Sequence, residues 1–409
     1  MTREEVILDV KKTLKISIEG KDIREEIQLA LSKINANFLI LSICTGFGKS
    51  KIALNSVVGN NILIIHKQNA HKMSWEDEII KWGFSYNVTY STYNSLYKLE
   101  GQHFDTIIAD EIHGGATDIR LYSLQRIKWD KLICLSATIP DEKMKMLYSL
   151  GKPVIVNLPI NKSIMWGITP IPKIKVISHF LNNTNRNQKY IKSKDKTRKD
   201  LIIPYQDRYK YFSDKSHNII VSCTEQEYHE LLIQDIEYWK QRFFKEKLEY
   251  QKNKWLRLTL NRKIWLNHLK TNVAKQLITK LKSKRIIVFT TDIKQCEELG
   301  KNKEGIIHSK NSKSLSLIKE FNDGKINHLY SVNMIVESVN LVDLDCAVMV
   351  NLDASTILIT QKLGRSFRSV EPEVYVIKIP YTRDSEFFDK MKEELDESYF
   401  EYIKLEDIK

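Results

Sequence analysis

The chain has 409 residues, a hydrophobic share of 42%, and 64 Lys and Arg against 51 Asp and Glu, which gives a formal net charge of +13 at pH 7. Its length exceeds one typical domain of about 100–200 residues and indicates two domains with ordinary buried cores. The basic balance fits either a polyanionic partner, such as nucleic acid, or a basic protein without such a partner.

The five cysteines are far apart and show no CxxC spacing, so neither a zinc site nor a disulfide framework is indicated. Reduced thiols fit a cytosolic protein. The first five residues are mostly polar or charged, unlike a signal peptide, and no apolar run approaches the ~20 residues that cross a bilayer. The sequence therefore predicts a soluble, cytoplasmic protein without a membrane partner.

The first thirty residues read as two short elements. Apolar alternation at Ile7 and over 14–18 predicts a strand pair or an arm over residues 1–20. Residues 23–31 follow with apolar positions at helical spacing, which predicts a helix. This helix carries Arg24 and Gln28. A glutamine there is usually a solvated polar position, but its amide could also read the edge of an adenine.

A glycine-rich loop follows the next apolar run, residues 38–41, and precedes a predicted helix that includes Ile52. Its residues are Thr45, Gly46, Phe47, Gly48, Lys49 and Ser50. The order strand, glycine turn, Lys-Ser, helix is typical of a phosphate-binding loop, in which backbone N–H groups surround a phosphate. Lys49 would reach the β- and γ-phosphates and Ser50 would bind Mg²⁺. The match is partial, because Ile43 occupies the first glycine position.

Two adjacent carboxylates, Asp110 and Glu111, end the apolar segment 104–109. In an open α/β sheet, ligands lie at the carboxyl ends of the strands. Asp110 could hold Mg²⁺ through water, and Glu111 could orient or deprotonate an attacking water. A solvated loop is the alternative, and the preceding phosphate loop favours the site. Strands at 61–66, 88–93 and 131–138, separated by helical lengths, predict a parallel, doubly wound sheet. The last of these strands ends with Ser136 and Thr138.

Prolines at 159, 170 and 172 mark a change of domain near residue 165. We expect domains at 1–165 and 166–409. Residues 182–207 are polar and basic, which predicts an exposed loop, with phosphate contact as the alternative. Strands at 285–290, 306–309, 329–332, 347–350 and 374–377 predict a second parallel sheet.

Residues 224–283 are helical in pattern and contain Trp239, Trp255 and Trp265. Between Trp239 and Arg285 there are fifteen Lys or Arg and two Glu. Such a mixture of cations and aromatic rings is expected where a protein follows a nucleic-acid backbone and stacks on bases. A helical pair with tryptophans in its core and solvated lysines fits equally well. The candidate nucleic-acid contacts in this segment are Lys252, Lys254, Trp255 and Arg257.

Residues 361–368 contain Gln361, Arg365 and Arg368 in a Gln-x-x-Gly-Arg-x-x-Arg pattern. The two guanidinium groups are about one helical turn apart and can point the same way. Arginines supplied by a second domain can neutralise charge that develops on a transferred phosphoryl group.

In this order, the loop at 45–50, the tetrad Asp110, Glu111, Ile112 and His113, and the triad 136–138 resemble motifs I, II and III of superfamily 2 helicases of the DExH type. Residues 23–28 resemble the adenine-reading Q motif, and 361–368 resemble motif VI, with Lys362 in place of the usual Arg. Residues 331–341 resemble motif V, with Ser338 in place of Gly. The resemblance spans about residues 21–380 and is greatest to phage-type branch-migration and recombination helicases.

The resemblance implies two tandem RecA-like parallel-sheet α/β domains, with the basic helical segment inserted in the second, and ATP in the cleft between them. It implies catalytic roles for Lys49, Asp110, Glu111, Arg365 and Arg368. It implies nucleotide contacts by Arg24, Gln28, Thr45, Gly46, Gly48, Lys49, Ser50, Asn340 and Gln361, and Mg²⁺ ligation at Ser50 and Asp110. It implies that ATP hydrolysis is coupled to movement through His113, Ser136, Thr138 and Glu337. Nucleic-acid contacts are expected at His66, Thr92, His308 and Ser309, besides the basic helical segment.

We therefore expect an ATP- and Mg²⁺-dependent DNA helicase or translocase that remodels branched DNA, acting as a monomer in the cytoplasm of a bacterial or phage-infected cell. An RNA helicase and a DNA-translocating subunit of a restriction system remain alternatives. A non-enzymatic nucleic-acid-binding protein on a decayed helicase scaffold is a third. Against the last stand Lys49, Glu111 and both arginines, because a decayed ATPase is expected to lose at least one of them.

Overall fold

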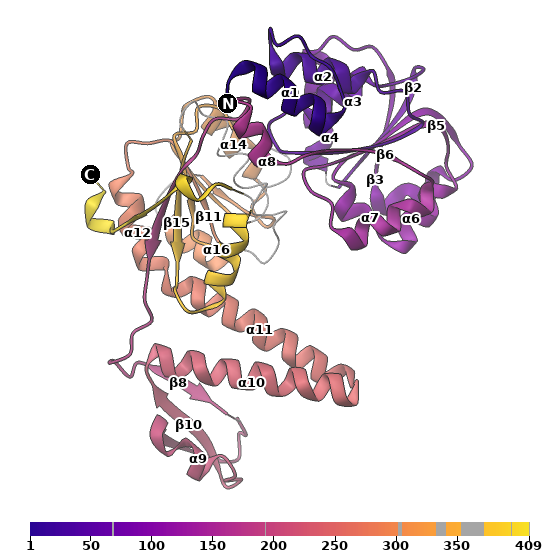
Figure 1. Ribbon diagram of the computed structural model, residues 1–409. Coiled ribbons are helices and arrows are strands. Elements are labelled where there is room, and N and C mark those ends of the chain that lie inside the picture. The colour runs from indigo at the N-terminus through magenta and orange to yellow at the C-terminus, as the bar shows by residue number, and fades with distance from the viewer. Residues whose placement is uncertain are drawn as a thin grey trace.

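The computed structural model describes residues 1–67, 69–192, 194–301, 305–332, 341–352, 372–393 and 395–408, with the backbone alone described at residues 69 and 70. Figure 1 shows two α/β domains, each built on a sheet, and a helical hairpin with a small third sheet that projects from the second domain. In the described part of the chain, no helix combines the length and apolar character needed to span a bilayer.

The N-terminal sheet has six parallel strands in the order β3-β2-β4-β5-β1-β6. The strands are β1 (Phe38–Ile43), β2 (Asn61–His66), β3 (Asn87–Thr92), β4 (His103–Ala109), β5 (Lys128–Ser136) and β6 (Val154–Leu158). All six residues of β1 are buried, as expected for a central strand of a parallel sheet covered on both faces. The predicted strands of this domain are confirmed.

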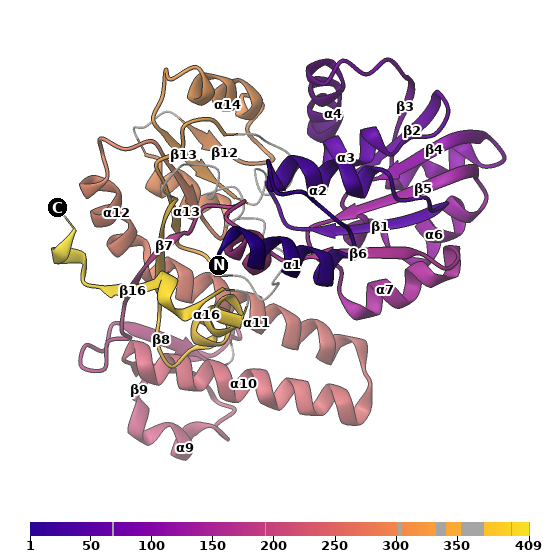
Figure 2. The ribbon, with the colours of Figure 1, turned by 45° about the horizontal axis from the view of Figure 1, so that its top comes forward.

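Helices cover both faces of this sheet (Figure 2). They are α2 (Ile23–Ser32), α3 (Lys49–Asn55), α4 (Asn69–Lys81), α5 (Ile112–Gly115), α6 (Asp118–Gln125), α7 (Asp141–Leu147) and α8 (Ile160–Met165). Side chains of β1 alternate between the two layers, since Leu39 and Leu41 pack in the cluster that contains α2 and α3, whereas Phe38 and Ile40 pack with α6 and α7.

The strand pair expected over residues 1–20 is wrong, because Arg3–Leu14 form helix α1. Thr2 and Glu5 form a capping box at its start. The buried residues Val6, Val10 and Leu14 are four apart, so they share one face of a helix. The alternation in the sequence was therefore the weaker of two periodicities in this segment.

The second sheet has seven parallel strands in the order β12-β13-β11-β14-β15-β7-β16. They are β7 (Lys173–Ser178), β11 (Ile286–Phe289), β12 (Ile306–Ile307), β13 (His328–Ser331), β14 (Cys346–Met349), β15 (Glu373–Lys378) and β16 (Phe400–Ile403). Helices α12 (Thr271–Lys280) and α13 (Ile293–Leu299) cover one face, and α14 (Ser314–Asn322) and α16 (Arg383–Glu393) cover the other. The predicted fold class of two parallel-sheet α/β domains is confirmed.

Between β7 and α12 the chain leaves the second sheet and forms a separate unit. It consists of β8 (Gln188–Ile191), β9 (Lys199–Pro204), α9 (Arg208–Tyr211), β10 (His217–Cys223), α10 (Glu225–Glu246) and α11 (Glu249–Leu269). Helices α10 and α11 form the hairpin in Figure 1, and β10 lies between β8 and β9 in the small sheet. Short 3₁₀ helices complete the chain at Tyr93–Leu99, Tyr148–Leu150, Tyr205–Asp207, Glu397–Tyr399 and Leu405–Asp407.

The expectation of an exposed loop over residues 182–207 is therefore wrong, since this segment contributes two strands. The Asn218 side chain stabilises the connection between them, because its Nδ2 atom donates to the carbonyl oxygens of Asp195 and Arg198 and to Asp200 Oδ1. Only two residues of β8 and β9, Tyr190 and Ile203, are buried, so the apolar signal was hidden by the surrounding lysines. The domain boundary near residue 165 stays a prediction.

Candidate active site

The glycine loop connects β1 to α3 and depends on two backbone conformations that favour glycine. Gly46 and Gly48 have φ angles of +86° and +97°. A Cβ atom at Gly48 would also lie 2.5 Å from Gln28 Nε2, so the loop has no room for a side chain there. The two glycines therefore shape the loop that precedes Lys49.

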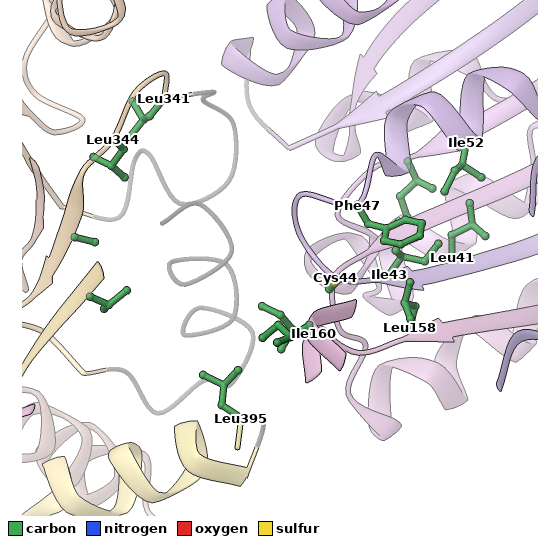
Figure 3. Packing of buried hydrophobic residues seen from close by; sticks show 14 of the residues in the cluster. Leu41, Ile43, Cys44, Phe47, Ile52, Leu158, Ile160, Leu341, Leu344 and Leu395 are labelled. Atoms are coloured by element: carbon green, nitrogen blue, oxygen red, sulfur yellow. The ribbon is translucent and has the colours of Figure 1, made fainter. Parts of the chain in front are cut away.

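Phe47 anchors the tip of this loop in the core. Its ring is fully buried, and Figure 3 shows it beside Ile43 and Ile52. The same hydrophobic cluster continues through Ile160 of α8 and includes residues of both sheets. The packing of Phe47 in the core thus holds the loop backbone, while the polar groups of the loop lie at the carboxyl end of β1.

Helix α2 holds the loop from the other side. Gln28 Nε2 donates a 2.6 Å hydrogen bond to the carbonyl oxygen of Phe47, and the Arg24 guanidinium donates to the carbonyl oxygen of Gly46. Both predicted adenine-reading residues thus contact the phosphate loop itself. Their contact with adenine stays a prediction.

The Lys49 ammonium lies within the loop. Its Nζ atom donates to the carbonyl oxygens of Ile43, at 2.9 Å, and Cys44, at 3.4 Å. Thr45 and Ser50, which flank the two glycines, are partly exposed. The loop therefore brings together glycine backbone, an ammonium and hydroxyl groups, as a phosphate site requires.

Asp110 follows β4 at the same carboxyl edge of the sheet as the glycine loop. Its Oδ2 atom accepts a 3.0 Å hydrogen bond from Trp75 Nε1 and lies 3.8 Å from His71 Nδ1, both on α4. Burial acts to raise the pKa of Asp110, but His71, Trp75 and Lys49 together lower it below the ordinary value. Asp110 is therefore ionised at neutral pH, and it lies at the same carboxyl edge of the sheet as the glycine loop, because β4 and β1 are parallel strands of one sheet.

Glu111 adopts a left-handed backbone conformation, with φ at 48° and ψ at 48°. This region is uncommon for residues other than glycine and is found where function constrains the chain. The Tyr93 hydroxyl donates a 2.6 Å hydrogen bond to the carbonyl oxygen of Asp110, which fixes the peptide before Glu111. The Glu111 side chain is 11% exposed, and its Oε2 atom lies 3.2 Å from His113 Nδ1.

His113 connects this carboxylate to the end of β5. Its Nδ1 atom lies 2.9 Å from Ser136 Oγ, and Ser136 Oγ donates a 2.7 Å hydrogen bond to the carbonyl oxygen of Thr138. Four predicted residues, Glu111, His113, Ser136 and Thr138, thus form one polar chain across two neighbouring strands. Their coupling role stays a prediction.

The oxygen donors at this site suit Mg²⁺, which prefers hard oxygen ligands and retains several waters. Asp110 offers an ionised carboxylate, and Ser50 offers a hydroxyl at the second residue of α3. The residues present therefore fit a magnesium ion held together with phosphate oxygens at the glycine loop.

The expected nucleic-acid contacts lie in separate places. His66 and Thr92 end the paired strands β2 and β3 and are direct neighbours in the sheet. His308 is buried, with Nε2 3.5 Å from Glu297 Oε1, and Ser309 is exposed after β12. Whether these four residues bind nucleic acid stays a prediction.

On α11, the Trp255 ring packs on Phe243 and Phe244, Lys254 lies over Trp239, and Arg257 is exposed. Lys252 lies 3.7 Å from Glu249. Trp265 packs against the core of the small sheet, where its ring centroid is 4.9 Å from that of Tyr228. Core packing thus accounts for Trp265, while nucleic-acid contact by Lys252, Lys254, Trp255 and Arg257 stays a prediction.

Five expected site residues fall outside the described residues. They are Glu337, Asn340, Gln361, Arg365 and Arg368. The described site is therefore the wall that the first domain contributes.

Residues 269–370 match the family model of the helicase conserved C-terminal domain. This segment is similar to that domain. It begins at the end of α11 and includes β11 to β14 of the second sheet. No curated protein sequence shows a significant match to the chain.

Solved structures share the two-domain fold. Saccharomyces cerevisiae Dbp5 bound to RNA and ADP BeF3 has 12% identity and a TM-score of 0.59, with 99% of this chain and 96% of that chain covered. A single-substitution variant of Dbp5, bound to the same ligands, has 11% identity and a TM-score of 0.57, with 98% and 94% covered. These structures show a likeness of fold, and the family-model match lies within the part of the chain that builds the second sheet.

Three residues around Asp110 were not expected from the sequence: His71, Trp75 and Tyr93. His71 and Trp75 are four apart on α4, so they share the face that meets β4, and this spacing was the available signal. Tyr93 follows β3 directly, at the same sheet edge as Asp110. Side chains that support a site from neighbouring elements leave little trace in a single sequence.

Proposed function

We propose that the protein is an ATP-dependent DNA helicase or translocase that couples ATP hydrolysis between its two domains to movement along nucleic acid and remodels branched DNA. The observation that carries the proposal is the convergence at one sheet edge of the glycine loop with Lys49, the Asp110 carboxylate and the polar chain from Glu111 to Thr138. The match of residues 269–370 to the family model of the helicase conserved C-terminal domain supports this proposal.

In this mechanism, the loop backbone and Lys49 bind the phosphates, and Ser50 and Asp110 hold Mg²⁺. A magnesium ion there supplies positive charge to the phosphate oxygens. Glu111, fixed by its strained backbone and by the anchored Asp110 peptide, orients the attacking water and takes its proton. Arg365 and Arg368 supply the opposing positive charge from the second domain. Hydrolysis then requires closure of the two domains.

Within superfamily 2, we assign the chain to the DExH type, through Asp110, Glu111, Ile112 and His113, and to phage-type branch-migration helicases. The protein acts as a monomer in the cytoplasm. An RNA helicase is the second candidate, since the structure of Dbp5 with 12% identity is bound to RNA. The two candidates share the same chemistry and differ in the strand that they follow.

The test is steady-state ATP hydrolysis without nucleic acid and with single-stranded DNA, branched DNA or RNA. Lys49→Ala and Glu111→Gln are each expected to lower turnover by about a hundredfold or more, because a phosphate clamp or a general base is lost, while nucleic-acid binding persists. Lys51→Ala is the matched control, since the Lys51 ammonium lies 4.2 Å from the centre of the Trp82 ring. Normal ATP turnover in either site variant would contradict the assignment of the site. Stimulation by RNA alone would identify RNA, rather than DNA, as the substrate.

A further inference from the structure

A cavity of about 620 Å³ lies away from the glycine loop, between the helical hairpin and the second sheet. It is lined by residues of α10, of α11 and of the turn that leads into α16. Its volume is within the range of roughly 300–1,000 Å³ that is usual for small-ligand sites. None of its lining residues belongs to the ATP site proposed above.

The cavity contains a buried arginine that is not engaged in an ion pair. Arg262 of α11 is only 6% exposed, and within the described part of the chain its guanidinium has neither an ion pair nor a hydrogen bond. Burial lowers the pKa of Arg262, with a further contribution from Arg383, while Glu386 and Glu237 act in the opposite direction. A buried cation without a partner is destabilising, so proteins rarely retain one unless a ligand completes it.

The two carboxylates that line the same cavity are already engaged. Glu237 Oε1 lies 3.6 Å from Lys240 Nζ, and Glu386 Oε2 lies 3.1 Å from Arg383 Nε. Each of these acids is thus balanced by its own cation on the cavity wall. Both carboxylates partly offset the charge of Arg262 through space, but neither pairs with it, and the three cations of the lining outnumber its two carboxylates, which favours an anion.

Two aromatic side chains complete the lining. Trp255 is half-buried on α11, and Tyr381 is 91% exposed at the turn before α16. Tyr381 also has a left-handed φ of 60°, a conformation that is costly for an aromatic residue and that marks functional positions. An arginine together with solvent-accessible aromatic rings is a combination that can bind a phosphate and the base attached to it.

We propose that this cavity binds a nucleotide through its monoester phosphate, with Arg262 as the counter-charge and with Trp255 and Tyr381 against the base. The nucleotide is either free in solution or the phosphorylated end of a strand. The second source rests on the proposed function, because only a protein that binds nucleic acid would meet strand ends.

Binding of thymidine monophosphate to the full chain, measured by calorimetry, tests the site. Arg262→Met is expected to weaken binding by about tenfold or more, the effect of a lost charge-assisted hydrogen bond. Arg242→Gln is the matched control and should bind normally, because Arg242 is a partly exposed arginine of α10 that is paired with Glu246 and does not line the cavity. Tyr381→Ala provides a second test with little risk to folding, since its side chain is exposed.

Thermal unfolding provides an independent readout. Without ligand, Arg262→Met should unfold at the same temperature as the wild type or higher, because it removes a buried charge that is not engaged in an ion pair. Thymidine monophosphate should raise the unfolding temperature of the wild type but not that of Arg262→Met. A short oligothymidylate with a 5′-phosphate, compared with its 5′-hydroxyl form, identifies the source. An Arg262-dependent preference for the phosphorylated form supports a strand end, and equal binding of the two forms supports a free nucleotide.

The proposal is overturned if neither thymidine monophosphate nor the phosphorylated strand binds, or if both bind Arg262→Met and Tyr381→Ala as they bind the wild type. It is also overturned if Lys49→Ala abolishes binding of the monophosphate while Arg262→Met retains it, since the ligand would then occupy the glycine loop. ATP hydrolysis by the same variants separates the two proposals. Normal turnover in Lys49→Ala contradicts the proposed function and leaves the cavity untouched.

Discussion

His113 Nδ1 lies 2.9 Å from Ser136 Oγ, so a side chain that follows β4 contacts one that ends β5. The hydroxyl hydrogen of Ser136 is directed to the carbonyl oxygen of Thr138, which leaves Oγ to accept from His113. The proton of the imidazole is therefore assigned to Nδ1, beside the Glu111 carboxylate. Through these contacts the Glu111 carboxylate is connected to the Thr138 peptide.

Replacing Ser136 with Ala is expected to separate hydrolysis from movement. The variant retains Lys49, Asp110 and Glu111 but loses the contact that connects His113 to Thr138. Strand separation per ATP should fall about three- to tenfold, the effect of one lost hydrogen bond, with little change in ATP turnover. Unwinding and hydrolysis assays on the same preparation measure this ratio. Ser149→Ala, at an exposed position, is the control, and an unchanged ratio in Ser136→Ala would contradict the coupling role.

Replacing Gly48 with Ala tests the shape of the phosphate loop. A Cβ atom there would lie 2.5 Å from Gln28 Nε2, and the φ of +97° is unfavourable for alanine. Gly83→Ala is the matched control, because its φ is +67° and nothing lies within 4 Å of the added Cβ. Gly83→Ala should cost about 1 kcal/mol of unfolding free energy through φ alone. Gly48→Ala should lose more unfolding free energy and should also raise KM for ATP. Equal losses in the two variants, without a change in KM, would contradict this interpretation.

His229 makes the C-terminal part of the molecule sensitive to acid. Burial lowers the pKa of His229 to about 4, helped by the charge of Arg262. The unfolded chain, with an ordinary pKa of 6.5, therefore binds a proton first as the pH falls. The contribution to stability is complete above pH 6.5 and is lost as the pH falls towards 4. Between pH 7 and pH 5 the loss is about 2 kcal/mol.

Urea unfolding of the wild type and of His229→Gln at both pH values checks this effect. The variant should be less sensitive to acidification, since glutamine does not titrate. The same loss of unfolding free energy in both proteins would show that other groups cause the acid sensitivity.

Reversing the charges of Lys252, Lys254 and Arg257 tests the basic face of α11. If these residues contact phosphates, affinity for nucleic acid should fall, and the slope of log K against log salt should decrease by up to about two to three units. Binding titrations at several salt concentrations give both values. Lys12→Glu, in helix α1, controls for net charge alone. Unchanged affinity and slope in the triple variant would assign the segment to structure only.

The sequence predicted both sheets and the contents of the first wall of the site because each depends on local pattern. Buried strands such as β1 are continuous apolar runs, and glycine is required at position 48 by backbone geometry. Helix α1 and the small sheet were missed for a physical reason. Both are half-exposed, so polar residues that remain in water obscure their periodicity, and only packing against the rest of the fold distinguishes the possible interpretations.

The supporting residues of the site could not be predicted either. Trp75 contacts Asp110 from a helix that is 35 positions earlier in the chain, and Tyr93 contacts the same residue from the end of β3. Neither residue type carries a chemical signature at these positions. The cavity at Arg262 is a similar case, because an arginine in a basic helix looks solvated until the fold buries it.

The hairpin of α10 and α11 is notable for its length as well as for its charge. Helix α10 has 22 residues, which corresponds to a length of about 33 Å at 1.5 Å per residue. Since the hairpin is attached to the second domain at its base, it turns with that domain like a lever arm (Figure 1). A rotation of only about 10° during domain closure would carry its tip through roughly 6 Å. A small angular change at the ATP site thus becomes a displacement on the scale of nucleotide spacing at the far end of the hairpin.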